Sequence, residues 1–131
     1  ERLGLSARVS FPGWLEERET HERLARAAIL VLPSQAEGLP MAVVEAFAWG
    51  VPVISTPVGS TPDLLHDGVE GLLIPVDDAD ALAGALQRLL DESALRRRLG
   101  GNARAFFAQH LDFGPYLDNL AACWRAAMPR N

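Results

Sequence analysis

Two carboxylates near a glycine, all within one short stretch, are the first sign of a ligand site in this sequence. Residues 33–56 read PSQAEGLPMAVVEAFAWGVPVIST, with Glu37 before a strongly apolar segment and Glu45 inside it. Carboxylates accept hydrogen bonds from hydroxyl pairs such as those of a ribose or a hexose. Burying a carboxylate without a partner is expensive, so Glu45 must open onto a polar cavity or pair with a cation. From their spacing alone, two interpretations are equally favoured. Either both carboxylates face one crevice, or Glu37 is solvated and Glu45 pairs with an arginine.

The residues around Pro40 predict an anion site. A helix is expected from Pro40 to Trp49, with the proline at its first position and Gly50 after its end. The first amides of a helix lack acceptors within the helix, and the helix dipole favours negative charge there. Pro40 has no N–H, so the free amides belong to Leu39, Met41 and Ala42. Such a site suits a phosphate.

Four runs of strand-forming residues surround these groups, at Ala7–Phe11, Ile29–Leu32, Pro52–Thr56 and Gly71–Ile74. Three of them are almost continuously apolar, which is typical of strands covered on both faces of a parallel sheet. Helical or turn-rich segments separate the runs. We therefore expect an α/β fold in which a partial Rossmann-like parallel sheet of about four strands is flanked by helices. Ligands in such sheets bind beyond the carboxyl ends of the strands, where Glu37 lies.

Helices account for most of the remaining sequence. A polar helix is expected between residues 15 and 28, and one helical turn between 62 and 65. Three helices should close the chain: Asp77 or Asp78 can cap the first, Ser93 can cap the second, and Pro115 opens the third. In the first of these, the inward face should carry the leucines at positions 82, 86, 89 and 90. Gly100 and Gly101 are expected to weaken the middle of the second helix. All 131 residues form one partial domain in this interpretation.

Composition narrows the function classes. The net charge of −5 argues against nucleic acid as a partner. A single cysteine excludes an intrachain disulfide, and the three histidines have no metal-ligand spacing. No apolar run reaches the length of a membrane-spanning helix. A cytoplasmic location is expected, and peripheral attachment of the intact protein to the inner membrane is left open.

The stretch PSQAEGLPMAVVEAFAWGVPV resembles the signature of retaining glycosyltransferases of family 4 (group 1). That signature has the form PS-x-x-EG-x-P-x-x-x-x-E-A-x-A-x-G-x-P-V, with seven residues between the two glutamates. FPGWL before it and STPVGSTPDLLHDGVEGLLIPVDDADALAGAL after it are similar to the family as well, so the resemblance covers nearly the whole chain. It implies the distal half of the C-terminal, donor-binding domain of a GT-B enzyme, truncated at its N-terminal side.

The resemblance also implies roles for the two glutamates and the start of the helix. Glu45 would bind the ribose hydroxyls of the donor nucleotide. Glu37 would be catalytic, contacting the donor sugar near the reaction centre. Backbone amides would face the sugar and the diphosphate at four positions, Gly38, Leu39, Met41 and Ala42.

Two flanking segments receive roles by the same resemblance. The base of the nucleotide would lie against Gly13, Trp14 and Leu15, and the phosphates would border the turn of Gly59 and Ser60. The family often has two glycines and a glutamate at this turn, whereas here Ser60 replaces the second glycine and Asp63 follows. We therefore interpret Asp63 as a structural cap. No metal and no cofactor are implied, because the nucleotide-diphosphate sugar is a substrate.

The reaction implied by the resemblance is transfer of a sugar from a nucleotide-diphosphate donor with retention at the anomeric carbon. In the family, a separate N-terminal domain binds the acceptor, and two further strand–helix units of the donor domain carry an arginine and a lysine that neutralise the diphosphate. These parts are missing from this chain, so the fragment alone is expected to be inactive. Two alternatives remain, a non-catalytic binding or assembly module and a GT-B-like nucleotide-sugar epimerase.

The family's strand order makes a further prediction about the sheet. The missing strands would lie between Ala7–Phe11 and the other three strands, which leaves an unpaired strand edge in this chain. Such an edge invites pairing with another chain. We therefore expect a homodimer, a strand-swapped assembly, or a displaced segment Ala7–Phe11.

Overall fold

A computed structural model describes residues 4–112, 114, 117–118 and 121–123 of the chain. In order, its elements are α1 (Glu17–Leu24), β1 (Leu30–Leu32), α2 (Met41–Ala48), β2 (Val53–Ser55), α3 (Thr61–Leu64), β3 (Gly71–Leu73), α4 (Ala79–Asp91), α5 (Ser93–Phe106) and the π-helical segment η1 (Phe107–Leu111). Pro115, where a last helix was expected to begin, lies outside the described residues. No helix in the described part is long and apolar enough to cross a membrane.

The three strands form a parallel sheet in the order β1-β2-β3. Leu30 lies opposite Val53 in the first pair, and Val53 lies opposite Gly71 in the second. All residues of β2 are buried, whereas those of β1 are only half-buried. The three later strand predictions and the α/β fold class are therefore confirmed, with the strands slightly shorter than expected.

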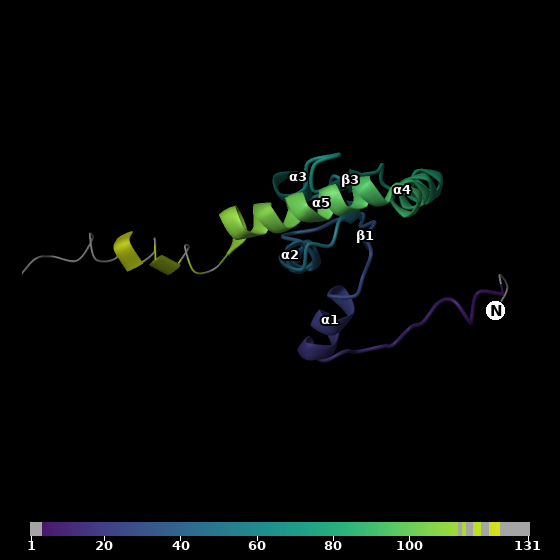
Figure 1. Cartoon of the computed structure of the whole chain (residues 1–131), viewed down its shortest axis with the longest axis horizontal. Helices are drawn as coiled ribbons and strands as arrows, with labels where there is room; N and C mark the ends of the chain where they lie inside the picture. Colours follow the sequence, from purple (N-terminus) through teal and green to yellow (C-terminus); the bar gives the residue numbers. More distant parts are fainter. Residues whose placement is uncertain (1–3, 113, 115–116, 119–120, 124–131) are drawn as a thin grey trace, which may run out of the picture.

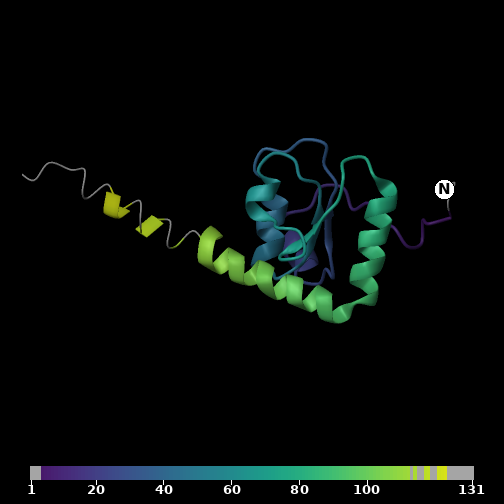
Figure 2. The same cartoon turned by 90° about the horizontal axis from the view of Figure 1, so that it is seen from above.

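Helices cover both faces of this sheet (Figure 2). Because successive side chains of a strand point to opposite faces, Val53 and Ile54 of β2 enter two different apolar clusters. The cluster around Val53 contains residues of α1, α2 and α3, and that around Ile54 contains Leu89 of α4. Helix α5 contributes to both clusters, through Ala103 on one side and Leu99 on the other. Coverage of both faces explains why the strands are so continuously apolar.

The fourth expected strand, Ala7–Phe11, is absent from the sheet. Within this segment the chain makes a turn, in which the amides of Arg8 and Val9 bond to the carbonyl of Leu5. The segment is exposed, and Phe11 is 91% accessible. Figure 1 shows it running along the side of the molecule that carries α1, away from the strands. A strand needs a neighbour to pair its backbone groups, and the described chain offers this segment none.

The ends of the later helices confirm one expected cap and correct another. Asp78 Oδ1 accepts a hydrogen bond from Ala81 N at 2.8 Å, so Asp78 rather than Asp77 caps α4. Ser93 does not cap α5, because it already lies inside the helix and Glu92 precedes it. Leu90 is 56% exposed, so its predicted place on the inward face is wrong. It lies one residue past the face that Leu89 buries, about 100° further around the helix.

Helix α5 crosses the end of α2 at backbone contact distance. Gly50 follows α2 with φ 68°, and Val51 N bonds to Ala46 O at 2.9 Å, which is the bond of a glycine C-cap. A Cβ atom at Gly100 of α5 would overlap the carbonyl oxygen of Gly50 and lie 3.3 Å from its carbonyl carbon. Gly100 was expected to weaken its helix, and the structure shows that it also permits this crossing.

We predict that Gly100→Ala lowers the free energy of unfolding by about 1–3 kcal/mol, because the methyl group pushes α5 away from the end of α2. Gly101→Ala is the matched control, since a Cβ there meets no atom within 4 Å. That change should raise stability by about 0.5–1 kcal/mol through helix propensity alone. Urea unfolding of both variants measures the difference, and equal effects would contradict the close crossing.

Candidate functional site

The loop that follows β1 is attached to β2 by buried hydroxyl groups. Ser55 Oγ donates to Leu32 O at 2.8 Å, and Thr56 Oγ1 donates to Ser34 O at 2.5 Å. Both donors belong to residues without solvent-accessible surface. These bonds extend the pairing of β1 and β2 beyond the last strand residues. The backbone of the loop is therefore fixed where it leaves the sheet.

Glu37 is held within this loop through its side chain. Its carboxylate atom Oε1 accepts a hydrogen bond from Ser34 Oγ at 2.5 Å, and the residue is half-buried. Among the described residues, the second oxygen, Oε2, receives no hydrogen bond. Glu37 is therefore not freely solvated, no cation of the described residues pairs with it, and one of its oxygens is available to a ligand.

The turn of Gly59 and Ser60 lies directly against Glu37 and Gly38. Ser60 N donates to Gly38 O at 3.1 Å. Gly59 has φ 55°, and a Cβ atom there would overlap the carbonyl oxygen of Glu37 and lie 2.7 Å from its carbonyl carbon. Only glycine permits this approach, which also uses a left-handed conformation that glycine adopts without penalty. Four of the predicted site residues are thus in direct backbone contact.

A third loop joins the same group from β3. Gln35 Nε2 donates to Asp77 Oδ1 at 2.8 Å, although 42 positions separate the two residues. Asp77 has φ 59°, an uncommon conformation for a residue with a side chain. The loops after all three strands therefore meet at the carboxyl edge of the sheet. The sequence indicates Asp77 only as a candidate helix cap, because spacing gives no signal for a link between positions so far apart.

The start of α2 presents unpaired amides beside these loops. The helix begins at Met41, one residue later than predicted, with Pro40 as its N-cap. The first helical bonds come from Val43 N and Val44 N to Pro40 O. The amides of Leu39, Met41 and Ala42 have no acceptor among the described residues. The predicted free amides are therefore present at the carboxyl edge of the sheet.

Glu45 lies on the same helix but opens onto a different space from that around Glu37. It is half-buried and lines a cavity of about 610 Å³. Its neighbours there come from α1, α2, α5 and η1, namely His21, Val44, Ala48, Trp49, Arg104 and Phe107. The alternative that Glu45 pairs with an arginine is not observed in the described part of the chain. Arg104 instead donates to Ala48 O and lies over the Phe107 ring.

The structure does not bring the predicted base-binding residues to these loops. Trp14 is 92% exposed, and a Cβ at Gly13 would meet no atom within 4 Å. Leu15 is half-buried just before α1. These residues follow the displaced segment Ala7–Phe11, so the described sheet has no neighbouring strand to position them.

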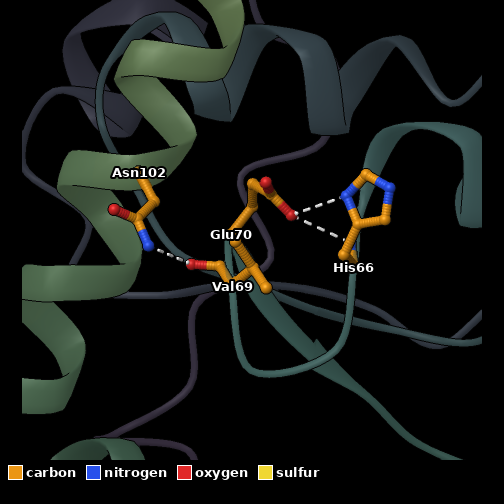
Figure 3. Close-up of polar contacts among 4 residues, drawn as sticks. All are labelled: His66, Val69, Glu70 and Asn102. Atoms are coloured by element: carbon orange, nitrogen blue, oxygen red, sulfur yellow. Dashed lines mark hydrogen bonds and ion pairs between the residues drawn. The ribbon is translucent and has the colours of Figure 1, made fainter.

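The turn before β3 contains a separate, buried carboxylate (Figure 3). Glu70 is 5% exposed, and its Oε2 accepts bonds from His66 N at 2.9 Å and lies 3.1 Å from His66 Nδ1. Asn102 Nδ2 donates to the carbonyl of the adjacent Val69 at 2.9 Å. These contacts satisfy Glu70 within its own turn and attach that turn to α5. Asp63, which we interpreted as a cap, is exposed, and α3 has no side-chain cap bond.

A parallel sheet with helices on both faces, and with loops that meet at its carboxyl edge beside free helix amides, defines a Rossmann-like α/β domain. Comparison with known proteins places the chain within this class. The family described as glycosyl transferases group 1 matches residues 1–106. The chain belongs to this glycosyltransferase family.

Two curated relatives show how much of such a protein the chain represents. An exopolysaccharide phosphotransferase of Streptomyces coelicolor is 38% identical over 103 residues, which cover 77% of this chain and 11% of that protein. A D-inositol 3-phosphate glycosyltransferase of Thermobifida fusca is 35% identical over 102 residues, covering 78% of this chain and 23% of that protein. The chain thus spans less than a quarter of either relative.

Solved structures share the fold. Sucrose-phosphate synthase of Thermosynechococcus elongatus superposes with a TM-score of 0.87 at 31% identity, covering 95% of this chain and 31% of that one. Anabaena HepE in complex with UDP-glucose gives a TM-score of 0.85 at 25% identity, covering 95% of this chain and 34% of that one. The three-stranded unit with its flanking helices is therefore part of a GT-B glycosyltransferase fold.

We predict that Gly59→Ala destabilises the protein more than Gly68→Ala. Both glycines have positive φ, but a Cβ at Gly68 meets no atom within 4 Å. Gly68→Ala should therefore cost about 1 kcal/mol of unfolding free energy from backbone strain alone. Gly59→Ala should cost about 1–3 kcal/mol more, because the methyl group forces the turn away from Glu37. Denaturant unfolding measures both, and indistinguishable losses would exclude the contact between the loops.

Proposed function

We propose that this chain is the donor-binding portion of a retaining glycosyltransferase of family 4, which binds a nucleotide-diphosphate sugar and takes part in transfer of the sugar to an acceptor. The observation that carries the proposal is the direct contact between the Glu37–Gly38 loop and the Gly59–Ser60 turn beside the free amides of α2. The structures of the relative HepE in complex with UDP and with UDP-glucose support a nucleotide sugar as the ligand class.

In this proposal the carboxyl edge of the sheet receives the charged and reacting parts of the donor. The amides of Leu39, Met41 and Ala42 donate to the diphosphate and the sugar, and the positive end of the α2 dipole adds to their effect. Gly59 lets its turn approach without a side chain, so phosphate oxygens can come close to the backbone. Free oxygen Oε2 of Glu37 accepts a hydroxyl of the donor sugar.

Glu45 takes the ribose in this proposal. It lies about one helical turn into α2, whereas Glu37 lies in the loop before that helix. The cavity that Glu45 lines has room for part of a nucleoside. Glu45 is half-buried and has no cation partner in the described part of the chain, and such a carboxylate is suited to two adjacent hydroxyls, which donate to its two oxygens. Gly13, Trp14 and Leu15 remain proposed contacts of the base, reached once the sheet has its further strands.

The proposed chemistry breaks the bond between the anomeric carbon and the diphosphate oxygen. The acceptor hydroxyl attacks from the same face, and its proton passes to the departing phosphate. This chain contributes amides to the developing negative charge, as in other preorganised anion sites. The cationic side chains and the acceptor site belong, in the proposal, to sequence outside this chain, so the fragment alone is inactive.

The test is donor binding by the natural full-length protein, with a panel of nucleoside diphosphate sugars that begins with UDP-glucose. Glu45→Gln should weaken binding of the best donor about tenfold or more, because hydrogen bonds to a charged group are lost. The bare nucleoside diphosphate should weaken equally, since the ribose is common to both. Titration calorimetry measures the two dissociation constants.

A second glutamate variant serves as the control for this experiment. Glu92→Gln removes an exposed carboxylate whose pairing with Arg88, at 3.3 Å, is more than half solvated. It should leave both dissociation constants unchanged. Unchanged affinity in Glu45→Gln would exclude the ribose role, and absence of any donor binding by the unmodified protein would overturn the proposed function.

A further inference from the structure

A continuous set of hydroxyl contacts leads from the core of the sheet to the carboxylate of Glu37. Thr56, which is fully buried at the end of β2, donates to the carbonyl of Ser34 at 2.5 Å. Ser34 in turn donates its single hydroxyl proton to Glu37 Oε1 at 2.5 Å. Ser34 thus accepts a hydrogen bond at its backbone carbonyl and donates one from its side-chain hydroxyl.

These contacts restrict the orientation of the Glu37 side chain. A glutamate has several rotatable bonds, and an exposed one samples many rotamers. Here the backbone of Glu37 is pressed against Gly59, and one carboxylate oxygen is bonded to Ser34. With both ends fixed, the position of Oε2 is set by the rigid end of β2. A hydrogen bond between a hydroxyl and a carboxylate is short and strong enough to hold such an orientation.

We propose that Ser34 is the positioning residue for Glu37, with Thr56 fixing Ser34, and that this pair determines how strongly the site prefers a nucleoside diphosphate sugar over the bare nucleoside diphosphate. The inference rests on the proposed function, which assigns the sugar to Glu37. Neither hydroxyl touches the ligand in this scheme. Their effect passes through the carboxylate, so it is confined to the part of the donor that the carboxylate contacts.

The experiment compares two dissociation constants in the natural full-length protein, one for the best nucleoside diphosphate sugar of the panel and one for its bare nucleoside diphosphate. Ser34→Ala should raise the first about tenfold and leave the second within twofold. Ser34→Thr keeps the hydroxyl and should restore the preference for the sugar. Thr56→Val should shift the ratio of the two constants in the same direction as Ser34→Ala, because it removes the hydrogen bond that fixes Ser34.

Ser55→Ala is the matched control. It removes a buried hydroxyl of the same kind, bonded to Leu32 O at 2.8 Å, one residue earlier and without a connection to Glu37. Any effect of loosening the strand end should therefore appear in Ser55→Ala equally for both ligands. The ratio of the two constants should stay at the value of the unmodified protein.

The outcomes separate this inference from the proposed function. If Ser34→Ala weakens both ligands equally, or if Ser34→Thr fails to restore the ratio, the positioning role is wrong while donor binding stands. If the unmodified protein binds neither ligand, the proposed function itself fails. A shift in the ratio confined to Ser34→Ala and Thr56→Val supports the inference.

Discussion

Burial of the central strand is the constraint on which the rest of this structure depends. Every residue of β2 is without solvent contact, and its alternate side chains need apolar partners on opposite sides of the sheet. Helices α1 to α3 supply them on one face and α4 on the other. Helix α5 packs against the clusters on both faces, so it must cross the end of α2. The two glycines at that crossing are therefore a consequence of covering β2, because bulkier residues would hold the helix away from one of the clusters.

The candidate site is a continuation of the same core. Where the backbone pairing of β1 and β2 ends, Ser55 and Thr56 remain buried. Their hydroxyl groups donate to backbone carbonyls at the end of β1 and in the loop that follows it. Buried polar groups must be paired, so these two residues connect the loops to the sheet at the point where the apolar residues stop. The loops at the carboxyl edge are consequently not a flexible margin of the domain. They are ordered by bonds that originate in its interior.

Much of this architecture could be predicted from local sequence, and the misses have identifiable physical causes. Continuous apolar runs indicated the three parallel strands, and Pro40 at the start of an apolar helical segment indicated the free amides at the start of α2. Ala7–Phe11 has the composition of a strand, but strand formation depends on a neighbour that composition does not reveal. The contact of Gly59 with Glu37 and the bond of Gln35 to Asp77 join distant positions, for which no short-range pattern exists. Spacing left open a shared crevice for both glutamates or a Glu45 paired with an arginine, whereas the structure directs Glu45 toward the cavity beside α1.

The backbone contact between the Glu37 loop and the Gly59 turn has a consequence for how a ligand enters. Two segments that touch carbonyl to Cα, with no side chain between them, have little freedom to separate by rotamer changes. The Glu37 loop and the Gly59 turn can therefore move only together, as one rigid part of the sheet's carboxyl edge. A ligand arriving at this edge meets a surface that is already arranged, so little conformational entropy is lost when it binds. Binding at this edge therefore does not require the two segments to fold around the ligand.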